Sequence, residues 1–202
     1  MTVSLVSYGL GNLGSVVNML KRVGAESRLV STPEEILASD QLLLPGIGAF
    51  DTGMRLLDAE AGRTDAIKAF AKTGKPMLGI CLGMQLLLDG SEEGVESGLG
   101  LISGTSTRFA EQPELRVPHM GWNVVVPAHD DALVDGLEPD SRFYFVHSYK
   151  VVPDRDADVL GTTTYGTPFA SMVRSGNVMG AQFHPEKSHA FGMRVLSNFA
   201  AL

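Results

Sequence analysis

The chain has 202 residues, of which 44% are hydrophobic, and its formal net charge at neutral pH is −7. This length allows one α/β domain with a sizeable core, and the acidic charge argues against nucleic acid or an anionic membrane surface as a partner. The longest apolar stretch, residues 76–88, is too short for a membrane-spanning helix and contains Gln85.

The first half of the chain alternates expected strands with expected helices. Apolar runs predict strands at residues 3–7, 27–30, 41–44 and 77–80. Helices are expected at residues 13–22 and 33–37, in two stretches that end near residue 73, and at 84–88. This alternation is typical of a parallel sheet covered by helices on both faces.

The second half of the chain is richer in strands. They are expected around residues 104–109, 123–126, 143–152, 159–165, 170–174 and 178–183. Ser175-Gly176-Asn177 predicts a hairpin turn, and a last helix is expected at 190–201. We therefore predict a single domain over residues 1–202, a flavodoxin-like three-layer α/β sandwich with a mixed, mainly parallel central sheet. Its site is expected at the carboxyl edge of the parallel strands.

Cys81 is the only cysteine in the chain. A single cysteine excludes an internal disulfide, and an unpaired thiol suits a reducing cytoplasm. The opening residues carry no basic region or cleavable signal pattern, which also favours a cytoplasmic location. No group of cysteines or histidines has the spacing of a zinc site, and we expect neither a metal nor a cofactor.

The surroundings of Cys81 predict a nucleophile. It lies between an expected strand and an expected helix, with Gly79 and Gly83 two residues away on either side. This pattern is the thiol counterpart of the Gly-x-Ser-x-Gly elbow, in which a strained turn exposes the nucleophile at the amino end of a helix. The helix terminus favours the thiolate. The alternative is an inert core cysteine, because free cysteines are often buried.

A candidate base and its orienting group lie near the end of the chain. His184 follows a predicted strand and precedes Pro185, which favours an extended backbone at the histidine. Side chains two residues apart in an extended segment project to the same side, so Glu186 can hold one ring nitrogen of His184. The other nitrogen is then available to Cys81, as in a nucleophile–base–acid triad. The alternative is a strand-end histidine beside a solvated glutamate.

A glycine-rich turn offers backbone donors for an oxyanion. An apolar strand ends in Pro45-Gly46-Ile47-Gly48, and glycines at such a turn free N–H groups to face a developing negative charge. The N–H of Leu82, directly after the proposed nucleophile, is the expected second donor. By itself this segment indicates only an ordinary loop between a strand and a helix.

The segment from Gly9 to Gly14 matches the Gly-x-Gly-x-x-Gly pattern of dinucleotide-binding proteins, with glycines at 9, 11 and 14. Such sites also need an acidic residue at the end of the second strand. Here that position has Leu29-Val30-Ser31, and Glu34 and Glu35 come only in the next helix. A tight turn without a nucleotide is the competing interpretation.

Six segments in the same order along the chain resemble the class I, or triad-type, glutamine amidotransferase family. The segments are residues 8–12 (Tyr8-Gly9-Leu10-Gly11-Asn12), 45–50, 79–87, 118–123 (Pro118-His119-Met120-Gly121-Trp122-Asn123), 147–149 and 183–188. The resemblance covers nearly the whole chain and departs at no triad position. Ile47 stands where valine is common in the family, a change that matters little if the backbone N–H does the work.

The resemblance implies a reaction and a substrate. Cys81 would attack the side-chain amide of glutamine, form a γ-glutamyl thioester and release ammonia, with His184 and Glu186 completing the triad. Ile47 and Leu82 would supply the oxyanion donors. The glutamine pocket would be lined by Gly48, Gln85, Glu93, His147, Ser148 and Tyr149. Gln85 and Glu93 each have a plainer alternative, as a polar helix position and a solvated loop charge.

The resemblance is closer to one branch of the family, in which the ammonia passes to a separate (βα)8-barrel cyclase subunit for histidine biosynthesis. The two chains would form a heterodimer. The candidate contacts with that subunit are Asn12, Met120, Trp122, Asn123 and Lys187. For Trp122 a core position is the alternative. The sequence is also compatible with two other functions, a triad glutaminase serving another synthase and a nucleotide-binding module.

Overall fold

The computed structural model describes residues 2–111 and 115–202. Within them, eleven strands form a main sheet in the order β2-β1-β3-β4-β13-β12-β10-β6-β5, with β11 on β12 and β8 on β11. The pairs from β2 to β13 are parallel, and β12 and β10 continue the sheet in antiparallel pairing. The order β2-β1-β3-β4 is the flavodoxin-like one, so the fold-class prediction is confirmed.

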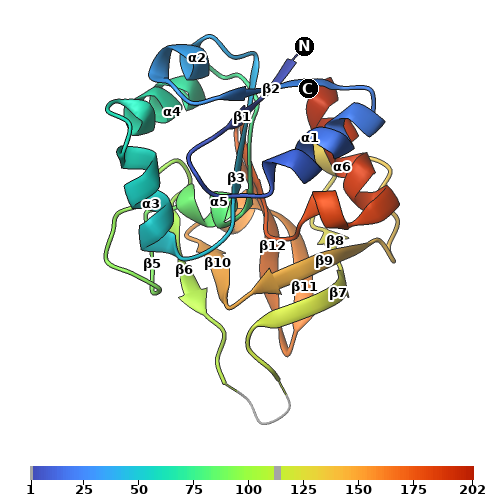
Figure 1. The fold of residues 1–202 in the computed structure, drawn as a ribbon. Helices are drawn as coiled ribbons and strands as arrows, with labels where there is room; N and C mark the ends of the chain where they lie inside the picture. Colours follow the sequence, from blue (N-terminus) through green and yellow to red (C-terminus); the bar gives the residue numbers. More distant parts are fainter. Residues whose placement is uncertain (1, 112–114) are drawn as a thin grey trace.

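The first half has the predicted alternation of strands and helices (Figure 1). Its strands are β1 (Thr2–Val6), β2 (Glu26–Val30), β3 (Gln41–Gly46), β4 (Met77–Cys81) and β5 (Gly90–Ser91). Its helices are α1 (Leu13–Arg22), α2 (Pro33–Leu37), α3 (Phe50–Asp58), α4 (Arg63–Ala71) and α5 (Leu82–Leu86). Local chemistry fixes several of these bounds. For example, Thr32 and Glu35 form a reciprocal capping box at the start of α2.

The second half supplies the antiparallel strands and the last helix. Its strands are β6 (Gly104–Arg108), β7 (His119–Val124), β8 (Val126–Pro127), β9 (Arg142–His147), β10 (Tyr149–Pro153), β11 (Val159–Tyr165), β12 (Thr167–Ser175) and β13 (Val178–Ala181). Its helices are α6 (His189–Ala201) and three short 3₁₀ turns, η1 (Ala132–Val134), η2 (Asp156–Asp158) and η3 (Pro185–Lys187). Ser175 pairs with Val178, so the hairpin predicted at Gly176 is confirmed.

The sheet separates two hydrophobic cores. Successive strand residues face opposite sides, so Leu42 and Leu44 pack with α2 to α5, whereas Leu43 packs with α1 and α6. Figure 1 shows α1 and α6 on one side of the parallel strands and α2 to α5 on the other. This arrangement gives the three predicted layers. In the described part of the chain, no helix is long and apolar enough to cross a membrane.

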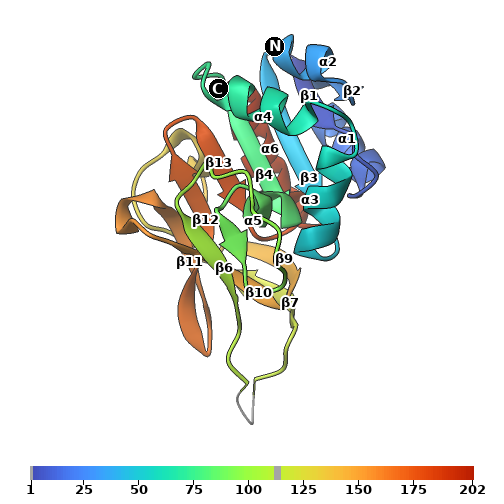
Figure 2. The same cartoon turned by 90° about the vertical axis from the view of Figure 1, so that its left-hand side faces the viewer.

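Two strand predictions were wrong in ways that bear on the site. The segment 143–152 was predicted as one strand, but it divides at Ser148 into β9 and β10, which belong to different sheets. β9 pairs with β7 in a small two-stranded sheet, and β10 pairs with β6 and β12 in the main sheet (Figure 2). Hydropathy does not reveal a change of pairing partner, because it indicates which residues are buried and not which strand lies alongside.

The other errors concern where elements begin. The strand predicted at 123–126 is in fact β7, starting at His119, followed by the short β8. The helix predicted at 84–88 is α5, which begins directly after Cys81 and ends at Leu86. It stops there because N–H groups of a later loop take up its last carbonyls, as when Leu99 N donates to Leu86 O at 2.9 Å.

Candidate active site

The carboxyl ends of β3 and β4 bring the proposed nucleophile beside the glycine-rich turn. In the strand register Gly46 is opposite Cys81, so the turn at Ile47 and Gly48 starts next to the thiol. Cys81 has φ 54° and ψ −111°, a conformation that residues with a side chain rarely adopt. The strained corner expected from the sequence is therefore present.

The two flanking glycines are required by close packing. A Cβ at Gly79 would lie 2.5 Å from the carbonyl oxygen of Gly83, and a Cβ at Gly83 would overlap the carbonyl oxygen of Leu44. Both clashes are with backbone atoms, which cannot relieve the contact by a change of rotamer as a flexible side chain can. The Gly-x-Cys-x-Gly sequence thus allows α5 to fold tightly over the ends of β3 and β4.

His184 lies next to Cys81, at the end of the segment that follows β13. Its Nδ1 is 2.8 Å from Glu186 Oε1, and both side chains are buried. The Nε2 atom is also buried, and among the described residues it has no hydrogen-bond partner. His184 and Cys81 both line the same pocket. Nε2 is therefore the ring nitrogen left for proton exchange with the thiol.

The environment of His184 favours the imidazolium form. Burial by itself would lower the pKa of His184, but the adjacent Cys81 and Glu186 side chains stabilise the positive charge and raise that pKa to about 9. The β9 strand fixes the loop that carries this histidine. Tyr144 O accepts a bond from His184 N at 2.9 Å, and Tyr144 N donates to Ser188 Oγ at 3.0 Å.

A pocket of about 320 Å³ opens over the thiol. It lies at the lower end of the range for small-molecule sites. Both proposed oxyanion residues and all six residues predicted to bind glutamine line it, together with Pro118 and Val146, which were not predicted to bind glutamine. The lining is Ile47, Gly48, Cys81, Leu82, Gln85, Glu93, Pro118, Val146, His147, Ser148, Tyr149 and His184.

The polar groups of the pocket are held in defined orientations. Gln85 Nε2 donates to Tyr149 O at 3.2 Å and to the side-chain oxygen of Gln182 at 3.0 Å. Both of its hydrogens are thus used, and Oε1 remains as the atom that Gln85 offers to a ligand. Glu93 Oε2 accepts a bond from the first N–H of α3, at Phe50, at 2.8 Å, which fixes the carboxylate at the pocket wall.

His147 contacts the pocket as a neutral ring. Burial lowers its pKa to about 3, although the hydrogen bond to Tyr149 opposes this shift. Its Nδ1 lies 2.8 Å from Tyr149 O, which can only accept, so Nδ1 carries the hydrogen and Nε2 is an acceptor. His119 Nδ1 lies 2.9 Å from that Nε2 and must be the donor. Both nitrogens of His147 are therefore engaged within the protein.

The residues predicted to contact a partner chain differ in exposure. Met120 and Trp122 are 62% and 46% exposed, so the core interpretation of Trp122 was wrong. Trp122 stacks on His189 with ring centroids 5.3 Å apart. Lys187 lies over the ring of Tyr144.

The two predicted asparagines are engaged locally. Asn12 is exposed and caps α1 by accepting from Ser15 N. Asn123 instead bonds internally, donating to Thr164 O at 2.9 Å and to His119 Nε2 at 3.2 Å.

The glycines of the apparent nucleotide motif have a structural explanation. Gly9 and Gly11 have φ of 93° and 99°, which suits the tight turn between β1 and α1. A Cβ at Gly11 would lie 3.2 Å from Pro45 Cβ, so the turn packs directly against the strand that leads to Ile47. Tyr8, just before it, donates to Pro45 O at 2.7 Å. Burial and the neighbouring Cys81 raise the pKa of this phenol.

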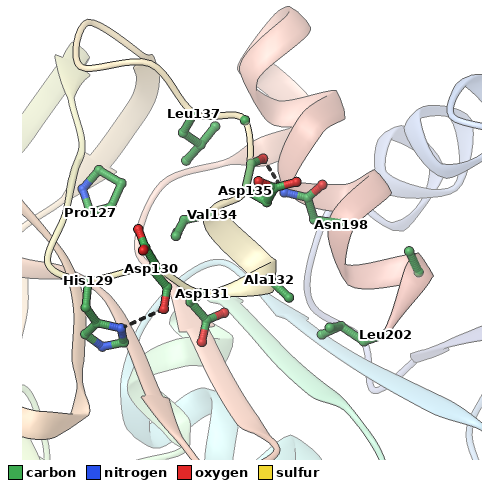
Figure 3. Close-up of a pocket in the computed structure, with 12 residues that line it drawn as sticks. Pro127, His129, Asp130, Asp131, Ala132, Val134, Asp135, Leu137, Asn198 and Leu202 are labelled. Carbon is green, nitrogen blue, oxygen red and sulfur yellow. Dashed lines mark hydrogen bonds between the residues drawn. The ribbon is translucent and has the colours of Figure 1, made fainter.

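A larger cavity of about 900 Å³ lies elsewhere, between the loop before η1 and the end of α6 (Figure 3). Its acidic walls include Asp130, Asp131 and Asp135, and Asp131 is paired with Arg174 at 2.6 Å. Figure 3 shows Asn198 bonded to the backbone of Asp135 across one wall. Although all the residues predicted for the site lie in the described ranges, none lines this cavity, so size alone does not locate the chemistry.

Comparisons with known proteins agree with the geometry. The family model for class-I glutamine amidotransferases matches residues 4–201. The imidazole glycerol phosphate synthase subunit HisH 2 of Pseudomonas aeruginosa is 47% identical over 199 residues, covering 98% of each chain. The subunit HisH of Methanosarcina barkeri is 50% identical over 198 residues, covering 96% of each.

Solved structures support the fold. A glutamine amidotransferase superposes with a TM-score of 0.73 at 22% identity, covering 99% of each chain. PurLQS from Thermotoga maritima also gives a TM-score of 0.73, at 21% identity, covering 98% of this chain and 96% of the other.

Proposed function

The chain belongs to the class-I glutamine amidotransferase family, and from this premise we propose that it is the glutaminase subunit of imidazole glycerol phosphate synthase. It hydrolyses glutamine to glutamate and ammonia. The ammonia serves a separate cyclase subunit, which makes imidazole glycerol phosphate and AICAR in histidine biosynthesis. The observation that carries this proposal is one pocket containing Cys81, His184 and every residue expected to bind glutamine.

The triad carries out the first half of the reaction. Glu186 holds the hydrogen on Nδ1 of His184, so Nε2 is free to take the proton of the Cys81 thiol. The thiolate attacks the amide carbon of glutamine, and the tetrahedral intermediate collapses to a thioester as the imidazolium protonates the departing ammonia. Backbone N–H groups at Ile47 and Leu82 are proposed to stabilise the oxyanion.

The second half reverses these roles. Nε2 of His184 removes a proton from water, which attacks the thioester carbonyl, and glutamate leaves as the thiol is regenerated. The acidic pocket residue Glu93 suits the α-ammonium group of glutamine. The free Oε1 of Gln85 also accepts a hydrogen bond from a donor of the substrate. His147 contributes a neutral ring surface to the pocket wall.

The partner is proposed to be a (βα)8-barrel cyclase in a heterodimer, working in the cytoplasm. Met120 and Trp122 are exposed apolar side chains on β7. Lys187, which directly follows Glu186, and Asn12, in the β1–α1 turn, are also exposed. Asn123 contributes indirectly, because its side chain is bonded to Thr164 and His119.

Glutamate formation tests the function directly. The assay compares the isolated chain with the chain mixed with the cyclase subunit and its nucleotide substrate. We expect weak activity alone, a strong rise in the mixture, and loss of activity in Cys81→Ala in both. Glutamate formation that persists in Cys81→Ala would refute the nucleophile, and full activity without the cyclase would point to another synthase.

A matched pair of variants tests the partner surface. Trp122→Ala should weaken binding of the cyclase subunit at least tenfold, since exposed aromatic residues are common anchors of interfaces. Leu29→Ala removes an apolar side chain that is similarly exposed, on β2, and should leave the affinity unchanged. Equal affinities for both variants, measured by titration calorimetry, would contradict the assignment of Trp122.

A further inference from the structure

Gln182 is a buried polar residue for which the sequence suggested no role. It follows β13, and its side chain is 0% exposed. Ala181 is opposite Ile80 in the parallel pair of β13 and β4, so the next residues along, Gln182 and Cys81, are neighbours. The Gln182 Nε2 atom lies 3.8 Å from Cys81 Sγ. The register of two strands about a hundred residues apart therefore places an amide beside the nucleophile.

The hydrogen-bond network determines which end of this amide faces the sulfur. Tyr149 O can only accept, so the atom of Gln85 beside it is the NH₂ group. The second hydrogen of that group points to Gln182, whose facing atom must be the carbonyl oxygen, 3.0 Å away. The NH₂ group of Gln182 is then the end directed at Cys81 Sγ.

A donor at this position has a clear electrostatic consequence. Cys81 is buried and packs among apolar residues of the core, including Ile80 and Ala181. Apolar surroundings disfavour a thiolate, whereas a donor to the ionised sulfur stabilises it, because hydrogen bonds to charged acceptors are stronger than neutral ones. A neutral amide achieves this without adding a charge that would compete with His184.

We propose that Gln182 is a further catalytic residue, whose side-chain NH₂ group donates to the Cys81 thiolate and keeps the sulfur directed into the pocket. This inference rests on the proposed function of Cys81 as the nucleophile. The amide of Gln182 is held in place by Gln85, which donates to its carbonyl oxygen. Tyr149 O, which orients Gln85, also accepts from His147 Nδ1 at 2.8 Å, and His147 accepts from His119 at 2.9 Å.

The test uses alkylation of Cys81 by iodoacetamide as a function of pH. Because Cys81 is the only cysteine, the rate reports the thiolate at one site. In Gln182→Met the midpoint should shift upward by about one pH unit, with alkylation about tenfold slower near neutral pH. Gln41→Met is the matched control, since Gln41 is also fully buried and donates to a backbone carbonyl, Phe199 O, at 3.2 Å.

Other titratable groups face Cys81 and must be separated from its ionisation. They are His184 on the loop after β13, Tyr8 on the β1–α1 turn, and His147 and Glu93 across the pocket. The control variant leaves all four in place, so a shift seen in Gln182→Met but not in Gln41→Met belongs to Gln182. An alkylation midpoint unchanged in Gln182→Met would overturn the proposal.

A measurement on the unsubstituted amide covers the case in which Gln182→Met does not fold. In the full-length ¹⁵N-labelled chain, the side-chain NH₂ signals of Gln182 should titrate with the alkylation midpoint, and this titration should disappear in Cys81→Ala. The same titration in Cys81→Ala would refute the contact. If glutamate formation itself survives Cys81→Ala, the proposed function fails; if it needs Cys81 but the Gln182 measurements show no effect, only this inference fails.

Discussion

Replacing Gly79 by alanine tests whether the tight corner at Cys81 is needed for both stability and chemistry. An added Cβ would lie 2.5 Å from Gly83 O and 2.8 Å from Met84 N, whereas ordinary contacts begin near 3.4 Å. The start of α5 would therefore have to move by about 0.9 Å relative to β4. Overpacking of this kind costs about 1–3 kcal/mol.

The same displacement acts on catalysis, because it moves Leu82 N–H and the thiol relative to each other and to the pocket. A misplacement of about 1 Å can reduce turnover about 100-fold. We therefore expect Gly79→Ala to unfold at lower urea, with a loss of about 1–3 kcal/mol, and to form glutamate about 100-fold more slowly.

Gly90→Ala is the matched control, since Gly90 is also a strand glycine and a Cβ there would meet nothing within 4 Å. It should retain stability and turnover, or gain slightly in stability because alanine loses less backbone entropy than glycine. Equilibrium urea unfolding and steady-state glutamate formation are measured on both variants. If Gly79→Ala is as stable and as active as Gly90→Ala, close packing at Gly79 is not needed for stability or activity and the prediction is refuted.

Two further predictions concern histidines. Glu186→Gln should slow glutamate formation by about 100-fold to 10,000-fold, because the amide can donate to Nδ1 of His184 and favour the wrong tautomer. Turnover that is unchanged across the pH–rate profile would contradict this role of Glu186. Burial lowers the pKa of His119 to about 4 and that of His147 to about 3, so the unfolded chain binds protons below about pH 6.5 while the folded chain does not. The free energy of unfolding should therefore fall by a few kcal/mol as pH drops from about 6.5 to about 4.5, and the fall should be smaller in His119→Phe. Urea midpoints that stay constant over this pH range would refute the prediction.

The sequence was sufficient for the parts of the site that local motifs encode. Cys81 with its two glycines predicts a strained corner, which the structure confirms. The contact between His184 and Glu186 is also present, but the extended segment predicted for it was wrong, because Pro185–Lys187 forms a 3₁₀ turn that brings the carboxylate to the ring. The strand–helix alternation then places the ends of β3 and β4 side by side, which follows from the general topology of parallel sheets. The pocket residues came from the family resemblance, and the structure brings them together around the thiol.

What the sequence did not reveal depends on register between distant strands. Gln182 lies within an apolar run, and only the pairing of β13 with β4 shows that it adjoins Cys81. His119 likewise becomes a partner of His147 only because β7 and β9 pair in a register that places them opposite each other. The change of sheet at Ser148 was missed for the same reason, because the hydrophobic pattern of one strand does not indicate which strand it pairs with.

The position of β13 between β4 and β12 also has a consequence for biosynthesis of the chain. The thiol is made early, but β13 follows it by about a hundred residues and inserts beside β4 only when nearly the whole sequence is available. The segment directly after β13 carries His184, the proposed base. A growing chain or a C-terminally truncated fragment therefore contains Cys81 without its proposed base. By the proposed triad mechanism, such fragments would not release ammonia from glutamine.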